Sequence, residues 1–370
     1  MPKQRRPLFS IKCVIFILTE HSVSLFPYHL ATMTVSSDPV TVSLDALKSG
    51  AADKFLPDAF GPNALGIIVV KDLPAKYAEL RSRVLFYSSK LAALSEQQLS
   101  MLECPESNYL VGWSCGKEKL LDGKPDTLKG SYYVNCSFYV DPTLDSAVVE
   151  KGEFDVDVIR GYVAGNMWPP EETLSGFQRC LKELCTFVID TASLVAKACD
   201  RYCLANIKNY TPGYLEHIVS TSTTTKARLL HYFPPTSSDS KDNWCGEHVD
   251  HSCLTGLTSA MYIDEVNNPT QELDKSPDPD GGLYIRNRDG EIVKVAIPRD
   301  CLAFQTGEAL QVVTENQFLA VPHFVKGSKI PGVCRNTLAI FCQPSLHEIV
   351  GDVDFATFAK NIVASHVIES

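Results

Sequence analysis

Eight short apolar segments follow one another between residues 226 and 345, with turn residues between them. Lengths of five to ten residues, enrichment in β-branched and aromatic side chains and bounding turns are typical of strands. Asp289-Gly290 stands between two of them and is a strong hairpin signal. The segments are Ala227–Phe233, Leu254–Ile263, Gly282–Arg286, Glu291–Ile297, Cys301–Gln305, Leu310–Thr314, Phe318–Val325 and Thr337–Cys342. Such a series predicts a mainly β fold, a jelly roll or barrel, rather than a parallel α/β sheet.

In the preceding half of the chain, the spacing of the apolar residues is typical mostly of helices. Leu65–Val70 is a compact β-type run, and residues 75–95 have the spacing of an amphipathic helix. A longer helix is expected after Pro169-Pro170, because apolar residues recur every three or four positions as far as Cys199. We therefore expect helices flanking the β-rich part. The expected divisions are an extension at 1–32, a helical and loop-rich region at 33–225, a catalytic core at 226–345 and a carboxy-terminal segment at 346–370.

Composition excludes some classes of protein and partner. The net charge is −10 and no Lys/Arg block occurs beyond the first few residues, which argues against a nucleic-acid surface. No run of 18 apolar residues exists, so no membrane span is expected. Thirteen cysteines at irregular spacings favour free thiols in a reducing compartment, and hence a cytoplasmic location. Residues 1–32 fit either a targeting segment or a disordered extension, and we expect a chain starting at Met33 to fold.

His248-Val249-Asp250 is the first half of a candidate metal site. In a strand, residues i and i+2 lie on the same face, so one imidazole and one carboxylate can point at a single ion. His323, on a later β segment, can supply a third ligand. Two histidines and one carboxylate on one face of an octahedron leave three positions open, an arrangement typical of non-haem Fe(II) oxygenases.

Arg335 and Thr337 follow His323 after a short interval and share a strand face by the same alternation. A guanidinium can hold a carboxylate in a bidentate fashion, and a hydroxyl can add a further hydrogen bond. The segment after them, Leu338–Phe341, is apolar, and a buried arginine needs a partner. We therefore interpret this pair as the anchor of a carboxylate co-substrate.

Together these stretches resemble the iron(II)/2-oxoglutarate-dependent dioxygenases of the isopenicillin N synthase-like group. The matching stretches in the carboxy-terminal half are Arg228–Pro235, His248–Leu257, Gly281–Ile285, Phe304–Thr314, His323–Val325 and Arg335–Phe341, and Ala64–Pro74 and Asn166–Pro170 resemble the group's amino-terminal region. The resemblance implies a distorted double-stranded β-helix (jelly roll) and iron held by His248, Asp250 and His323. It also implies 2-oxoglutarate bound by Arg335 and Thr337, with His231 in the same cofactor-binding group. The implied reaction is oxidation, by default hydroxylation, of a small organic molecule by dioxygen, with release of succinate and CO2.

The chain also departs from the group's pattern. Phe233 stands where a tyrosine commonly helps to hold 2-oxoglutarate, His231 stands where asparagine is common, and Phe324 replaces an arginine. The interval between His248 and His323 is lengthened by the polar, proline-rich stretch 265–281. These departures leave the iron ligands intact, and they concern the co-substrate and the substrate. Candidate substrate-pocket residues are Tyr133, Asn135, Met261 and Tyr262.

Three other interpretations remain open at this point. Gly112–Gly116 fits the G-x-S-x-G pattern of serine hydrolases, although the residues after it are broken by Gly and Pro. Cys245, His248 and His251 could begin a zinc site, but no distant second ligand pair stands out. The third interpretation is a catalytically silent jelly-roll receptor or binding protein, which consumption of 2-oxoglutarate would exclude.

Overall fold

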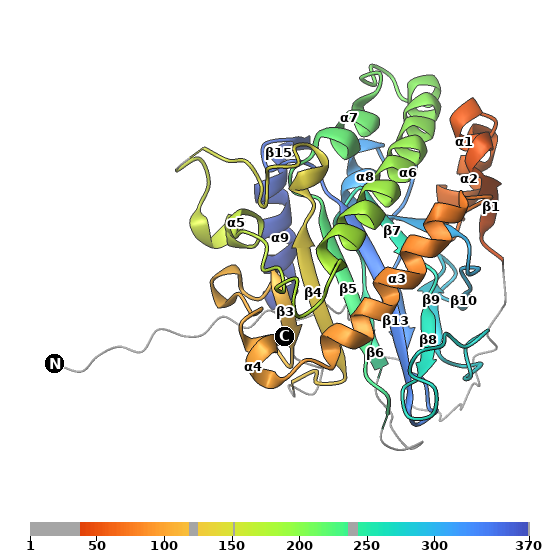
Figure 1. Cartoon of the computed structure of the whole chain (residues 1–370). Helices are drawn as coiled ribbons and strands as arrows, with labels where there is room; N and C mark the ends of the chain where they lie inside the picture. The colour runs from red at the N-terminus through yellow and green to blue at the C-terminus, as the bar shows by residue number, and fades with distance from the viewer. Residues whose placement is uncertain (1–37, 118–124, 151, 236–242, 369–370) are drawn as a thin grey trace, which may run out of the picture.

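The structure, a computed structural model, describes residues 38–117, 125–150, 152–235 and 243–368, with side chains described at all of these except 243–244 and 362–368. The extension expected at 1–32 lies outside these residues. Two large sheets and a set of helices make up the described part of the chain (Figure 1). It is therefore mainly β with flanking helices, as expected from the sequence.

The larger sheet has nine strands. Their order is β1-β2-β11-β7-β13-β5-β4-β3, and β8 also pairs with β13. The bounds are β1 Val40–Ser43, β2 Ile67–Lys71, β3 Gly112–Cys115, β4 Lys129–Asn135, β5 Lys226–Tyr232, β7 Leu254–Thr258, β8 Met261–Asp264, β11 Leu302–Thr306 and β13 Val333–Cys342. Strands from both sides of the boundary expected at residue 225 thus share one sheet.

The smaller sheet has four strands in the order β10-β9-β12-β6. They are β6 Asn243–His248, β9 Gly282–Arg286, β10 Ile292–Val295 and β12 His323–Lys326. Along the chain from β5 to β13 the path passes repeatedly from one sheet to the other. A separate two-stranded ribbon, β14 (Ile349–Val350) with β15 (Val353–Asp354), precedes the last helix.

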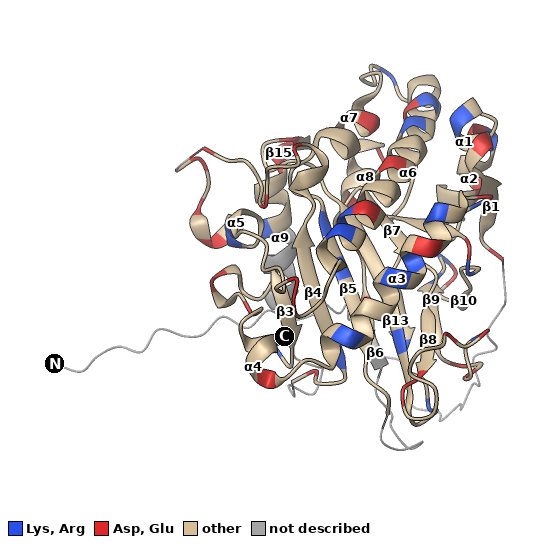
Figure 2. Cartoon of the chain, viewed as in Figure 1, with Lys and Arg blue, Asp and Glu red and all other residues tan. Residues whose placement is uncertain are grey.

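Two long helices, α3 (Ala75–Ala92) and α6 (Phe177–Asn206), cover one face of the nine-stranded sheet (Figure 1). Their apolar residues pack on the sheet, and most of their charged residues lie on the solvent side (Figure 2), with Arg81 of α3 and Asp200 of α6 as buried exceptions. Gly256 of β7 permits this close packing, since a Cβ there would lie 2.5 Å from Val188 of α6. The shorter helices are α1 Leu44–Ser49, α2 Leu56–Phe60, α4 Glu96–Ser100, α5 Val156–Val163, α7 Tyr214–Thr221, α8 Glu308–Val313 and α9 Phe355–Ile368, with 3-10 turns at Asp53–Phe55, Pro105–Ser107 and Ser137–Tyr139.

Two apolar cores result. The larger one lies between the helices and the outer face of the nine-stranded sheet. The smaller one lies between the two sheets and includes Val69 and Tyr232 from the large sheet and Leu283 and Ile285 from the small one. Because side chains alternate along a strand, each strand of the large sheet can contribute to both cores. The face that a residue occupies therefore decides which core it enters.

Some expected elements differ from the structure. The expected strand Leu310–Thr314 is wrong, because these residues belong mostly to helix α8. A segment of five residues, three of them apolar, does not distinguish strand from helix, and Glu308, Ala309 and Leu310 all favour a helix. The single strand expected over Leu254–Ile263 is two strands, β7 and β8. In the described part of the chain, no helix is long and apolar enough to cross a membrane.

Candidate metal and co-substrate site

His248, Asp250 and His323 come together at one end of the smaller sheet. His248 ends β6 and His323 begins β12, and the two residues are direct partners in the antiparallel register. The Nε2 atoms of His248 and His323 lie 3.7 Å and 3.9 Å from the two carboxylate oxygens of Asp250. One donor atom from each residue lies within 4.8 Å of the other two. The structure thus brings all three expected ligands to one point.

Backbone carbonyls fix the orientation of both imidazoles. The Nδ1 atom of His248 lies 2.8 Å from the carbonyl oxygen of Gly246, and that of His323 lies 3.3 Å from the carbonyl oxygen of Val321. A carbonyl oxygen only accepts, so each Nδ1 carries the proton and each Nε2 keeps its lone pair for an ion. Hydrogen bonding of the second ring nitrogen is the usual support of a metal-bound histidine.

Two polar side chains that the sequence did not single out complete this support. The Thr255 hydroxyl donates to Asp250 Oδ2 at 2.6 Å. The Gln305 amide nitrogen lies 2.5 Å from His323 Nδ1, and its oxygen is buried without a hydrogen-bond partner among the described residues. A half-turn of this amide, which exchanges N and O, lets the oxygen accept the Nδ1 proton. Neither residue has a distinctive spacing in the sequence, so only the fold reveals its role.

The electrostatics of the cluster favour a bound cation. Burial lowers the pKa of His323 to about 4, and the neighbouring His248 adds to this effect. Burial alone raises the pKa of Asp250, but His323, His248 and the Thr255 hydrogen bond outweigh it, and the pKa lies below its usual range. A neutral His323 beside an ionised Asp250 matches the protonation states that a metal ion requires of these ligands.

Arg335 lies on β13 with its side chain toward the smaller core. It is the register partner of Tyr232 on β5 and of Tyr262 on β8, so the three side chains share one face. The guanidinium is buried and lies 5.0 Å from the centre of the Tyr232 ring. Its Nε and Nη1 atoms have no hydrogen-bond partner among the described residues. A buried guanidinium with unused donors is suited to bind a carboxylate.

Thr337 lies two residues further along the same face of β13, and its hydroxyl makes one long hydrogen bond, 3.4 Å, to the Thr258 carbonyl. His231 does not join this group. It is the register partner of Asn336, and both side chains lie on the outer face toward α3. Phe233 also packs with the outer core. The sequence pattern did not reveal the role of Tyr232. This residue lies between His231 and Phe233 and faces Arg335.

Of the four candidate pocket residues, Tyr133 and Tyr262 lie on the inner face of the large sheet, inferred from their register partners Arg228 and Arg335. Asn135 is occupied by structural hydrogen bonds to Ala164 and Asn166. Met261 belongs to the outer core. The structure therefore retains the two tyrosines as pocket candidates.

The two rival motifs receive no support from the geometry. Ser114 lies within strand β3, paired with Ser131, and not at the strand-to-helix turn that a nucleophilic serine requires. Cys245 lies 3.8 Å from His248 Nδ1, the nitrogen already used by Gly246. His251 is absent from both groups of metal-competent residues found among the described residues.

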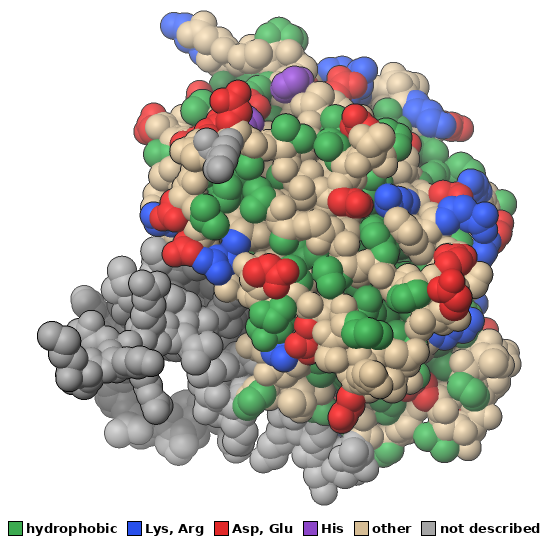
Figure 3. All heavy atoms as spheres, turned by 60° about the vertical axis from the view of Figure 1, so that its left-hand side comes forward, with side chains coloured by type: hydrophobic (Ala, Val, Ile, Leu, Met, Phe, Trp, Pro, Cys, Tyr) green, Lys and Arg blue, Asp and Glu red, His purple; other side chains and the backbone are tan. Residues whose placement is uncertain are grey.

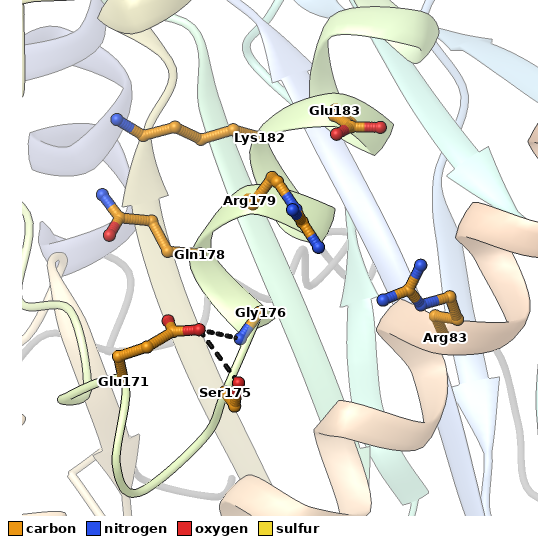
Figure 4. A pocket seen from close by; sticks show the side chains of 8 residues that line it. All are labelled: Arg83, Glu171, Ser175, Gly176, Gln178, Arg179, Lys182 and Glu183. Carbon is orange, nitrogen blue, oxygen red and sulfur yellow. Dashed lines mark hydrogen bonds between the residues drawn. The ribbon is translucent and has the colours of Figure 1, made fainter.

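A surface hollow lies elsewhere, between α3 and the start of α6 (Figure 4). Glu171 accepts hydrogen bonds there from the Ser175 hydroxyl and the Gly176 amide, while Arg83, Arg179 and Glu183 mix both signs of charge. It lies on the helical side of the large sheet, opposite the smaller core, and has no part in the site. On the face shown in Figure 3, acidic, basic and apolar side chains are likewise interspersed.

We compared the chain with known protein families, curated proteins and solved structures. No family model matches the chain, and no curated protein matches it significantly. Solved structures do match. A 2OG-Fe(II) oxygenase family protein from Caulobacter crescentus superposes with a TM-score of 0.66 at 16% identity, over 89% of this chain and 99% of that one. A full-length Neurospora crassa protein, solved in complex with alpha-KG, gives a TM-score of 0.64 at 17% identity over 89% and 98%. The rice dioxygenase for auxin oxidation gives 0.58 at 14% over 89% and 96%. The chain therefore has the fold of these oxygenases.

Proposed function

We propose that this protein is an Fe(II)- and 2-oxoglutarate-dependent oxygenase that hydroxylates a small organic molecule. Its two sheets form the distorted double-stranded β-helix of that class, with the smaller core as the interior. The observation that carries the proposal is the buried Arg335 guanidinium, whose Nε and Nη1 atoms have no partner among the described residues, in the same interior as the His-Asp-His group. A metal group alone fits many enzymes, but a metal group with a buried arginine whose Nε and Nη1 have no partner in the described part of the chain fits a carboxylate co-substrate.

The donor set fits ferrous iron. His248 and His323 each present Nε2 and Asp250 presents a carboxylate oxygen, which is the two-histidine, one-carboxylate set of non-haem iron oxygenases. Bound there, iron supplies the activation of dioxygen and the oxidation of the substrate. The protein residues orient the ligands: Gly246 and Val321 fix the rings, and Thr255 holds the carboxylate.

The co-substrate would lie with its distal carboxylate on Arg335. The Nη1 group, which has no partner among the described residues, would donate to this carboxylate, and the Tyr232 and Thr337 side chains lie on the same strand face to add hydrogen bonds. Tyr232 takes the place of the tyrosine contact that Phe233 lacks. Burial of this group excludes water, which strengthens the charge pairing and fixes the orientation of the co-substrate.

The substrate we expect is a small organic molecule bound between the iron site and the inner-face tyrosines, Tyr133 and Tyr262. Support comes from the structural neighbours, since structures of the Neurospora crassa protein contain thymine or 5-formyluracil and the JOX2 structure contains 2OG, Fe and JA. A pocket lined by aromatic side chains accommodates small organic compounds. Oxidation of the substrate is accompanied by conversion of 2-oxoglutarate to succinate and CO2.

The test is anaerobic titration of the Fe(II)-loaded protein with 2-oxoglutarate, followed by admission of air. An oxygenase should develop the visible charge-transfer absorption of chelated 2-oxoglutarate during the titration. After air is admitted, it should slowly convert 2-oxoglutarate to succinate even without substrate. Absorption without succinate would instead identify a silent binding protein. Absence of any absorption change would overturn the proposal.

A further inference from the structure

A second group of potential ligands lies on the outer face of the large sheet, away from the iron site. His231 comes from β5, Cys334 from β13 and Glu265 directly follows β8. One donor atom of each residue lies within 4.8 Å of the other two. His231 and Cys334 are buried and Glu265 is partly exposed, with 28% of its side chain accessible. The imidazole and the thiol are thus enclosed by protein, whereas the carboxylate is partly accessible to solvent.

The hydrogen bonds around Asn336 fix the protonation of His231. The Asn336 amide nitrogen donates to the Leu85 carbonyl (2.9 Å) and to Ser89 Oγ (2.8 Å), so its oxygen is the atom that faces His231. This oxygen lies 2.8 Å from His231 Nδ1 and can only accept. Nδ1 therefore carries the proton, and Nε2 presents a lone pair 4.0 Å from Glu265 Oε1. A nitrogen acceptor thus faces an oxygen acceptor, and a cation between them would satisfy both.

Cys334 adds a third electron-rich group. Burial raises the pKa of its thiol, and the nearby Glu265 carboxylate raises it further, through repulsion of a thiolate and by accepting a hydrogen bond from the thiol, whose proton a bound cation would displace. The Ser89 hydroxyl, whose oxygen already accepts from Asn336, lies 3.6 Å from Cys334 Sγ and can donate to it. A bound cation would satisfy the lone pair, the carboxylate and the thiolate at once.

We infer that His231, Glu265 and Cys334 form a second metal site, for a borderline-soft divalent ion such as Zn(II). Imidazole, thiolate and carboxylate are all zinc ligands, with bond lengths of roughly 2.0–2.3 Å. A tetrahedral ion then needs its donor atoms roughly 3.5 Å apart. The distance between His231 Nε2 and Glu265 Oε1 is 4.0 Å, and the donor atom of Cys334 lies within 4.8 Å of both, so the three ligands would draw together around the ion. The fourth position lies on the open side.

The site joins three strands around the segment that carries Arg335. Cys334 and Asn336 flank Arg335 on β13, with their side chains on the opposite face. An ion here would fasten β5, β8 and β13 to one another and to α3 through Asn336. We therefore assign it a structural role, independent of turnover.

Co(II) is the probe that separates this site from the iron site. Cobalt bound by a thiolate gives an intense near-ultraviolet charge-transfer band, and the proposed iron ligands include no sulfur. The metal-free full-length protein should bind two Co(II) ions, one of which produces this band, and excess Zn(II) should abolish it. Cys334→Ala should lose the band and bind one ion. Glu265→Gln should weaken the band-forming site at least tenfold.

Two matched controls make the result decisive. Cys342→Ala removes another buried thiol from the same face of β13, and it should keep the band. Cys245→Ala tests the thiol beside His248, and it should also keep the band. Circular dichroism and binding of the remaining ion check that Cys334→Ala is folded. No band in the wild type, or a band lost with Cys245→Ala and retained with Cys334→Ala, would overturn the second site and leave the iron site unaffected.

Discussion

Arg335 on β13 lies directly across from Tyr232 on β5, and its guanidinium carbon lies 5.0 Å from the centre of the Tyr232 ring. The neighbouring pair in the register, Asn336 and His231, points to the opposite side of the sheet. One step along the strands therefore separates the proposed co-substrate site from the proposed second metal site. Substitutions on the two faces of these strands should consequently have separable effects.

Arg335→Leu should weaken 2-oxoglutarate binding by on the order of a hundredfold or more. Hydrogen bonds between charged groups are worth about 1.5–3 kcal/mol, and about 1.4 kcal/mol is tenfold. Anaerobic titration of the Fe(II) protein measures the loss. Iron binding should be unchanged, because Arg335 is not a ligand, and a variant that titrates like the wild type would remove the anchor.

Tyr232→Phe should weaken 2-oxoglutarate binding about tenfold, through loss of one hydrogen bond to a carboxylate. Phe233→Tyr is the matched change at the next position. It should leave binding unchanged, because Phe233 packs with the outer core. The same titration compares the two variants. Tighter binding by Phe233→Tyr would show that the faces of β5 are assigned the wrong way round.

Asp250→Ala should abolish both iron retention and turnover, since it removes the anionic ligand and leaves two imidazoles. Iron content after desalting and succinate formation are the measurements. Asp264→Ala removes a carboxylate whose hydrogen bonds go to Asn267 and the local backbone, and it should retain both properties. Full iron occupancy in Asp250→Ala would contradict the ligand set.

Glu272→Leu should lower the free energy of unfolding by about 3–5 kcal/mol, because it removes the buried carboxylate that pairs with Arg81. Both side chains are almost fully buried, and Arg81 Nη1 and Nη2 bond the two Glu272 oxygens at 3.1 and 2.8 Å. Urea unfolding measures the change. The control is Glu79→Gln, which breaks the exposed pair with Arg83 and should cost well under about 1 kcal/mol. Equal losses in the two variants would contradict a structural role for the buried pair.

Lys226 should give the protein a pH-dependent stability. Its buried ammonium donates to the Leu110 and Gly161 carbonyls and to Asn135 Oδ1, and burial lowers its pKa from 10.5 to about 7. Between these values only the unfolded chain holds the proton, so the contribution of Lys226 to the free energy of unfolding rises with pH. The slope is at most about 1.4 kcal/mol per pH unit.

Comparing wild type with Lys226→Met at about pH 7 and pH 9 isolates this contribution, since all other groups are shared. The stability of the wild type relative to the variant should increase over that interval. A constant difference would mean that Lys226 stays protonated in the folded protein.

The mainly β character of the second half, the long helices and the three proposed iron ligands could all be predicted from the amino-acid sequence. Strand alternation, turn residues and the H-x-D spacing depend only on residues close together in the sequence, so they do not change with the tertiary contacts of the segment. The proposed role of Arg335 could also be predicted from the sequence, because an arginine before an apolar strand needs a buried partner. The helix over Leu310–Thr314 could not be predicted, because a five-residue segment with three apolar residues fits either a strand or a helix until the amide of the preceding Glu308 is seen to donate to the Asp250 carbonyl.

Which side chains share the interior with Arg335 depends on how the strands pair in the folded protein. Alternation fixes that neighbours on a strand point to opposite faces, but the register against β13 decides which set faces inward. That register puts Tyr232 beside Arg335 and sends His231 and Phe233 to the helical side. It likewise brings Glu265 and Cys334, distant in sequence, to His231, and Gln305 to His323. Pairing between strands is a long-range property of the folded sheet, so no local pattern could reveal it.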